Sequence, residues 1–132
     1  MPAKHRIDDN AKLIITTWED EAIDVDLIEA IKDYQKNIQS KDDYLFYNEL
    51  VDFSSVTGLK LTVNGIKRLG SIASCTDQKG FNKKLALIVN SNVAYGFAKM
   101  YETYRGIQKN SNKEVRVFRT RADAFRWLQA TL

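Results

Sequence analysis

The sequence predicts an α/β domain built on a mostly parallel sheet of four to five strands, with four helices packed on its faces. Apolar runs suited to strands alternate with segments whose apolar residues recur at helical spacing. Strands that are joined through helices run parallel and connect by right-handed crossovers. The expected strands are residues 13–18, 44–51, 85–89 and 115–118, and residues 1–9 form either a flexible tail or a short first strand near 4–7.

The strand predictions rest on the pattern of apolar residues within each run. Runs 44–51 and 85–89 are nearly unbroken, as expected of central strands that are covered on both faces. In the last run Val115 and Val117 alternate with Arg116, which indicates an edge strand with one wet face.

The helix predictions rest on apolar spacing and on capping residues. Asp26 and Glu29 have the spacing of a capping box for the first helix. Gly106 is expected to end the third helix as a left-handed cap, because glycine has no Cβ to clash there. The four helices are expected to begin at Asp26, near Thr62, after residues 90–92 and after the N-cap Thr120.

The third helix carries several aromatic residues. At helical spacing Phe97 and Tyr104 fall on the expected core face, while Tyr95 and Tyr101 project from other faces. Exposed tyrosines can mark an interface or the rim of a pocket, although structural packing is the simpler account of this pattern.

Composition indicates one soluble domain that spans residues 1–132. Hydrophobic residues make up 44% of the chain and charged residues 28%, which is ordinary for a globular protein. The first ten residues contain no apolar signal region, and no apolar run is long enough to cross a bilayer. The single cysteine, Cys75, excludes an internal disulfide. We therefore expect a cytoplasmic protein without a transmembrane segment.

Charge is divided unevenly along the chain. Residues 1–59 carry a net charge of −7 and residues 60–132 a net charge of +10. A basic half could attract nucleic acid, but no block of Lys and Arg and no RNA-binding signature accompanies it. The pattern favours two halves that face each other, within one fold or between subunits.

No complete catalytic or cofactor-binding pattern is present. The six glycines fit neither standard phosphate-binding loop. The only histidine, His5, lies in a polar segment expected to be mobile, so Ser54 and Ser55 lack a base and are expected to form turns. Cys75 is expected to be a small packed residue. We predict no enzyme, no metal site and no cofactor.

The junction at residues 44–65 is where we expect the site. The apolar run stops at Asp52, a Ser/Thr-rich turn is expected to follow, and a helix opens near Thr62. Open α/β sheets usually bind ligands at the carboxyl ends of their strands. Residues at these expected strand ends are the candidates for binding a partner or ligand: Asp52, Ser54, Ser55, Thr57, Thr62, Asn64, Asn90, Ser91, Asn92 and Arg119.

Three segments carry a resemblance when taken together: ELVDFSSVTGL, KLALIVNSNVAYGFAKMYETY and VRVFRTRADAFRWL. They resemble the SpoIIAA-like family, which shares the STAS fold of anti-sigma-factor antagonists, and the resemblance covers residues 10–132. The last segment is similar to the family's strand ending in Phe-Arg with a following Ala-x-x-Trp-Leu helix.

The resemblance implies a binding module rather than an enzyme. In STAS antagonists a Ser before a Gly at the start of the second helix can be phosphorylated. Here Asn64 precedes Gly65, so the resemblance implies no clear phosphorylatable serine, while Thr57 and Thr62 are explained by turn and cap roles.

Two functions therefore remain from the sequence. The first is a non-enzymatic regulatory module that acts through protein contacts, with itself as a homodimer or with another protein. The alternative is a carrier of a small apolar or lipid-like ligand, because the SpoIIAA-like architecture is shared with some lipid-carrying domains. Its pocket would lie at the strand ends near 52–57, 90–92 and Arg119.

Overall fold

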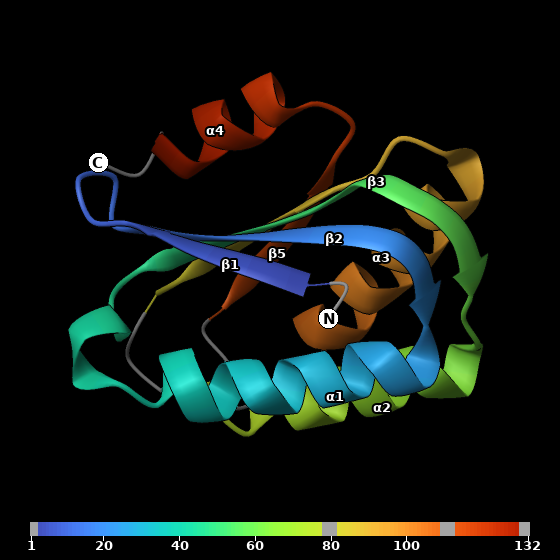
Figure 1. Ribbon diagram of the computed structural model, residues 1–132, viewed down its shortest axis with the longest axis horizontal. Helices are drawn as coiled ribbons and strands as arrows, with labels where there is room; N and C mark the ends of the chain where they lie inside the picture. The colour runs from blue at the N-terminus through green and yellow to red at the C-terminus, as the bar shows by residue number, and fades with distance from the viewer. Residues whose placement is uncertain (1–2, 78–81, 109–112, 130–132) are drawn as a thin grey trace.

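The computed structural model describes residues 3–77, 82–108 and 113–129, and contains one five-stranded sheet with helices on both sides (Figure 1). The strands lie side by side in chain order, β1-β2-β3-β4-β5. They are β1 (Ala3–Asp8), β2 (Leu13–Ile23), β3 (Asn48–Lys60), β4 (Lys84–Ile88) and β5 (Glu114–Phe118). The main helices are α1 (Asp24–Tyr34), α2 (Val63–Ser74), α3 (Asn92–Gly106) and α4 (Arg121–Gln129).

The sheet confirms the predicted α/β class. Strands β2 to β5 are parallel, and β1 pairs antiparallel with β2 as a hairpin. Of the two alternatives for the first nine residues, the strand is correct. His5, which was expected in a mobile segment, lies within β1, and its Nδ1 is 2.7 Å from the Thr16 hydroxyl.

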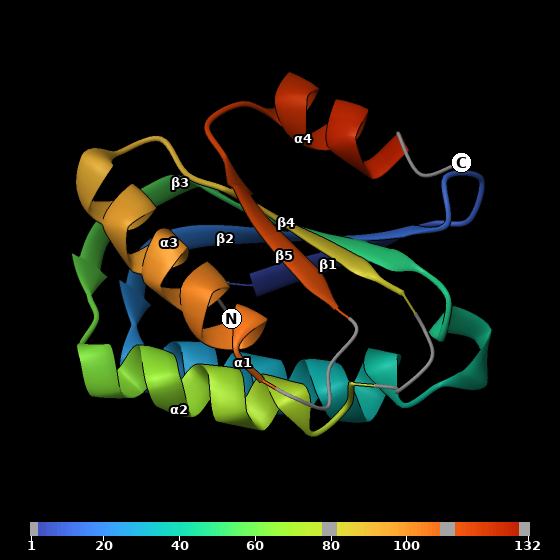
Figure 2. The ribbon, with the colours of Figure 1, turned by 180° about the vertical axis from the view of Figure 1, so that it is seen from behind.

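The two faces of the sheet are covered unequally. Helices α1, α2 and α3 lie on one side, whereas α4 lies on the other (Figures 1 and 2). Because side chains alternate along a strand, Leu50 packs toward α4 while its neighbours Glu49 and Val51 face the three helices. The α4 side contains a close-packed cluster of Leu13, Ile15, Leu50, Ala86, Ile88, Ala124 and Leu128.

The predicted Ser/Thr-rich turn after Asp52 is wrong. Strand β3 begins at Asn48, not at residue 44, and continues past Asp52 to Lys60. It pairs with the similarly long β2, from Leu13↔Asn48 to Ile23↔Lys60, with two register shifts along the way. Backbone pairing over this length outweighs the local turn preference of the serines, because each paired residue satisfies its own peptide groups.

Several predicted element ends also differ. Helix α1 begins at Asp24 after Ile23, whose side chain makes no capping hydrogen bond, so the expected Asp26–Glu29 capping box does not start the helix. Gly106 belongs to α3, which has its C-cap at Ile107 with φ −95°, so no left-handed glycine ends the helix. Cys75 is exposed rather than packed.

Candidate functional site

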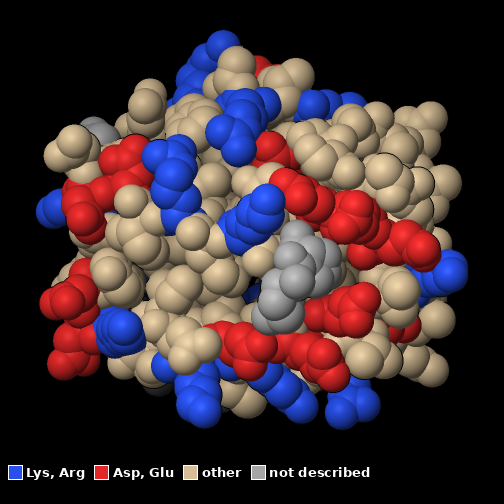
Figure 3. Space-filling model, in the orientation of Figure 1, with Lys and Arg blue, Asp and Glu red and all other residues tan. Residues whose placement is uncertain are grey.

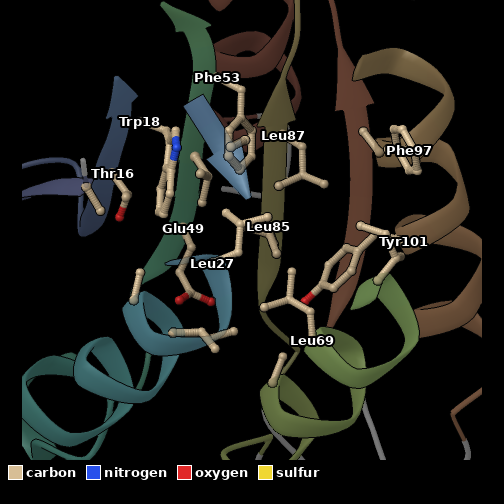
Figure 4. Close-up of a pocket in the computed structure, with 18 of the residues that line it drawn as sticks. Thr16, Trp18, Leu27, Glu49, Phe53, Leu69, Leu85, Leu87, Phe97 and Tyr101 are labelled. Atoms are coloured by element: carbon tan, nitrogen blue, oxygen red, sulfur yellow. The ribbon is translucent and has the colours of Figure 1, made fainter. Parts of the chain in front are cut away.

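A cavity of about 160 Å³ lies between the sheet and helices α1, α2 and α3. Its wall is mostly aliphatic and aromatic, and Figure 4 shows side chains from strands and helices converging on the same space. Its apolar residues include Trp18, Leu27, Phe53, Leu69, Leu85, Leu87 and Phe97.

The strand pattern explains why these side chains meet. Phe53 follows Val51 on the same face of β3, and Leu85 and Leu87 share one face of β4. Trp18 is 2% exposed, and its Nε1 donates to the Glu21 carbonyl at 3.0 Å, which satisfies the polar atom of a ring that otherwise packs against apolar neighbours.

Glu49 is a buried charged side chain in the wall. The Tyr34 hydroxyl and Gln39 Nε2 donate to Glu49 Oε2 at 2.5 and 2.7 Å, and Lys113 Nζ donates to Oε1. Burial raises the pKa of Glu49, but the charges of Lys113 and Lys83 and the hydrogen bonds from Lys113 and Tyr34 outweigh it and hold the pKa at about 2. Glu49 is therefore an ionised carboxylate with three side-chain donors.

Arg105 is another buried charge in the wall. It is 2% exposed, and its Nη1 and Nη2 donate to the two carboxylate oxygens of Asp77 at 2.7 and 2.8 Å. Nη1 also donates to Gln108 Oε1 at 2.5 Å. Within residues 3–77, 82–108 and 113–129, Arg105 Nε is the one buried side-chain nitrogen or oxygen without a hydrogen-bond partner.

Tyr101 lies one turn before Arg105 on α3 and also lines the cavity. It is 7% exposed, so the expectation that it projects away from the core is wrong. The helix packs on both the sheet and α2, and this widens its buried face beyond a single stripe. Burial raises the pKa of Tyr101 to about 12, against the opposing effect of Arg105, so the hydroxyl is protonated.

The ten residues singled out from the sequence lie elsewhere, and none of them lines the cavity. Asp52 is buried, with Oδ2 accepting from Arg121 Nε at 3.0 Å and Oδ1 from the Ser54 amide at 2.8 Å. Burial raises the pKa of Asp52. The hydrogen bonds from Ser54 and the ion pair with Arg121 lower the pKa by more than burial raises it, so the pKa of Asp52 is below its usual range. Ser55 and Thr57 are exposed on β3.

Three more candidates, Thr62, Asn64 and Ser91, lie at the starts of helices α2 and α3. Thr62 caps α2 by accepting from the Gly65 amide at 3.0 Å, and its hydroxyl donates to Asp24 at 2.6 Å. Asn64 is exposed in the first turn of α2. Ser91 caps α3 by accepting from the Ala94 amide at 3.1 Å. These roles satisfy helix amides that lack a partner within the helix.

Two contacts bring other candidates together. Asn90 Nδ2 donates to the Ser54 carbonyl at 2.7 Å, which ties the end of β4 to β3. Arg119 Nη2 donates to Asn92 Oδ1 at 3.1 Å, and its guanidinium lies 4.4 Å from the ring centre of Tyr95. At the carboxyl edge of the sheet these candidates thus act as polar caps and links between elements.

Sequence reasoning gave no site role to several polar residues of the cavity wall: Thr16, Tyr34, Gln39, Glu49, Arg105 and Lys113. One signal was available, because Glu49 is a charged residue directly before Leu50 and Val51 in a run read as a buried strand. A charge within such a strand is buried only with partners. The partners come from sequence positions far from Glu49, so their identity requires the fold.

Some acidic side chains of residues 1–59 form ion pairs with basic side chains of residues 60–132 within the fold. Among the described residues, three ion pairs join an acid of residues 1–59 to a base of residues 60–132. They are Glu21–Lys60, Glu49–Lys113 and Asp52–Arg121. The face drawn in Figure 3 carries acidic and basic side chains in interspersed groups.

Among the residues that the structure describes, no group of three or more His, Cys, Asp or Glu side chains is placed to hold a metal ion. Across residues 3–77, 82–108 and 113–129, no helix has both the length and the apolar character needed to span a bilayer.

Comparison with known proteins identifies the fold. No protein-family model and no curated protein matches the sequence. A solved structure matches with a TM-score of 0.55 and 13% identity, over 96% of this chain and 91% of that chain. It is the crystal structure of an uncharacterized protein of the DUF3478 family from Shewanella loihica PV-4, described as having a SpoIIAA-like fold. The chain therefore has the SpoIIAA-like α/β fold that its sequence resemblance predicted.

Proposed function

We propose that this protein is a non-enzymatic binding module of the STAS type that holds a small, mostly apolar ligand in the cavity between the sheet and α1–α3. The single observation that carries the proposal is the cavity itself. Its volume of about 160 Å³ is similar to that of an engineered apolar cavity of roughly 150 Å³ that binds benzene. A single ring or a short acyl chain is the matching size.

This proposal takes up the second function expected from the sequence and moves its site. The ligand lies between the sheet and the helices, rather than at the strand ends near Asp52 and Asn90. The state of Glu49 supports binding rather than acid–base catalysis. Its carboxylate already accepts from three side chains, and a pKa of about 2 makes it a weak base at neutral pH.

Filling the cavity tests the proposal. Ala98 on α3 lines the cavity, and Ala98→Leu places additional carbon atoms in the space that the ligand would occupy. Titration with toluene, followed by NMR shifts of the Leu and Val methyl groups, should show saturable binding to the wild type. Binding to the variant should be weaker by about tenfold or more, with an unchanged or higher melting temperature.

The matched control is Ala122→Leu. Ala122 is exposed on α4, on the other side of the sheet, so the same change of side chain should leave toluene binding unaltered. Absence of saturable binding to the wild type, or equal loss of binding in both variants, would contradict a ligand site in this cavity.

Protein contact is the second candidate function, and exposed valines at the carboxyl edge of the sheet favour it. Val25 is 61% and Val63 48% exposed, at the starts of α1 and α2, which the Asp24–Thr62 hydrogen bonds hold together. Val93 is 63% exposed at the start of α3. Exposed apolar side chains at these helix starts suit contact with a second copy or another protein.

Sedimentation equilibrium tests the homodimer form of this candidate. The wild type should sediment as a dimer, and Val63→Asp should dissociate it, because a charge would be buried without a partner. Ile107→Asp is the control, since Ile107 is 70% exposed and follows the opposite end of α3. A wild type that stays monomeric at high concentration would refute the homodimer.

A further inference from the structure

We infer that the ligand of this cavity carries a hydrogen-bond-accepting oxygen, as a carbonyl or a carboxylate, and that Arg105 and Tyr101 bind this oxygen. The inference rests on the proposed ligand-binding function and adds the chemical class of the ligand. It follows from which buried donors and acceptors in the cavity wall already have partners.

Arg105 supplies a donor without an acceptor. Its two terminal nitrogens are held by Asp77 and Gln108, whereas Nε is buried and unpartnered among the described residues. A buried N–H without an acceptor is costly, because it has lost its hydrogen bonds to water and gained none. Since Arg105 is part of the cavity wall, an oxygen of a bound ligand can accept the missing hydrogen bond from Nε.

Tyr101 supplies a second donor next to the first. Figure 4 shows its hydroxyl directed toward the same end of the cavity as the Glu49 carboxylate. The hydroxyl stays protonated at neutral pH, and Arg105 is near enough to oppose the effect of burial on the pKa of Tyr101. Two neighbouring donors at the end of an apolar space match a carbonyl or carboxylate oxygen, which accepts two hydrogen bonds.

Glu49 does not lead to the opposite choice, an amine ligand. Its two oxygens already accept from Tyr34, Gln39 and Lys113. A ligand ammonium would have to displace one of these donors and would be repelled by Lys113 and by Arg105. The hydrogen bonds that Glu49 already accepts and the unpartnered Nε of Arg105 therefore both favour a ligand with an accepting oxygen.

Four compounds with one ring and different polar groups test the inference on the wild-type protein: toluene, acetophenone, benzoate and benzylamine. Affinities come from the same NMR titration. Acetophenone or benzoate should bind about five- to tenfold more tightly than toluene, as one hydrogen bond to a buried donor allows. The ketone and the acid together show whether the preferred oxygen is neutral or anionic.

The variants separate hydrogen bonding from packing. Arg105→Met removes Nε but leaves Asp77 buried without its cation, so it destabilises the fold as well and is not a test of binding alone. Tyr101→Phe removes only the hydroxyl and should lower acetophenone or benzoate affinity several-fold, while toluene affinity stays the same. Tyr104→Phe is the control, because the Tyr104 hydroxyl lies 3.0 Å from Ser71 Oγ and the residue is outside the cavity wall.

The outcomes distinguish the two proposals. Binding of toluene with no preference for the oxygen-bearing compounds would overturn the ligand class and leave the cavity function standing. A preference for benzylamine, or an oxygen preference that Tyr101→Phe does not reduce, would also overturn it. Failure of all four compounds to bind would refute the proposed function itself.

Discussion

Glu49 shows how one residue can stabilise the fold while lining a cavity. It is a buried carboxylate at the start of a central strand, with donors from three separate segments: Tyr34 of α1, Gln39 after it, and Lys113 before β5. Breaking a buried pair by removing one charge costs more than the pair contributes, because the other charge stays buried without compensation.

The pKa of Glu49 gives this contribution a pH dependence. The folded value is about 2 and the ordinary value is 4.5, so the folded protein favours the ionised form. The stabilisation is therefore complete above pH 4.5 and is lost as pH falls from 4.5 to 2. A shift of this size corresponds to about 3 kcal/mol.

Replacing Glu49 with Gln should remove this dependence. At pH 7 we expect Glu49→Gln to lower the free energy of unfolding by about 3 kcal/mol, and at pH 2 the difference from wild type should be small. Urea denaturation at a series of pH values measures both. Glu29→Gln is the control, since Glu29 is exposed on α1 and should behave as wild type. A difference that is equal at pH 7 and pH 2 would contradict the assignment.

At the scale of elements, close packing of α2 on α3 depends on a glycine. A Cβ on Gly70 would lie 2.6 Å from Tyr104 Cδ2 and 2.9 Å from Cε2, within the body of the ring rather than at a flexible tip. Gly96 on α3 has nothing within 4 Å of the same position. The two glycines thus offer the same substitution with and without a neighbour.

We expect Gly70→Ala and Gly96→Ala to change stability in opposite directions. Gly70→Ala should lower the free energy of unfolding by about 1–3 kcal/mol, because overpacking forces the helices apart. Gly96→Ala should raise it by about 0.5–1 kcal/mol, the usual preference of a helix for alanine. Thermal denaturation of both variants measures the contrast, and equal effects would show that Gly70 is not a packing constraint.

The sequence was sufficient for the type and order of the elements and insufficient for some of their ends. Apolar residues predicted a strand at 85–89 and the helix α3, although Tyr101 of α3 is buried where it was expected to project from another face. The stretch from Phe53 to Lys60 carries turn-forming residues, and only its pairing with β2 makes it a strand. That pairing is a long-range interaction and leaves no mark within a short window of sequence.

The cavity could not be predicted for a related reason. Each of its walls was visible as an ordinary apolar face of a strand or helix, and a filled core has the same pattern. A void depends on the volumes of side chains from five or more segments after they pack. Arg105 and Tyr101 can be identified as lining residues only once the position of the cavity is known.

For the whole molecule, we expect truncation of a core side chain to change toluene affinity only when the side chain lies on the cavity face of the sheet. Leu128 of α4 is 6% exposed on the side away from the cavity. Leu128→Ala should cost about 2–5 kcal/mol of stability yet leave toluene affinity unchanged, at a temperature where the variant is folded.

Leu85→Ala provides the comparison on the other face. Leu85 is 8% exposed and lines the cavity, so its truncation should cost a similar amount of stability and also change toluene affinity by enlarging the site. Equal toluene affinities for the wild type and Leu85→Ala would contradict a ligand in contact with this side chain.

Helix α4 has a consequence for how the protein reaches its folded state in a cell. It follows every strand in the sequence and, among the described helices, it alone covers the face that contains Leu13, Ile15 and Ile88. A chain still being synthesised can therefore complete its sheet while this apolar face remains in contact with water. Until Arg121–Gln129 has left the ribosome, the nascent protein offers a flat surface on which chaperones or other nascent chains can bind.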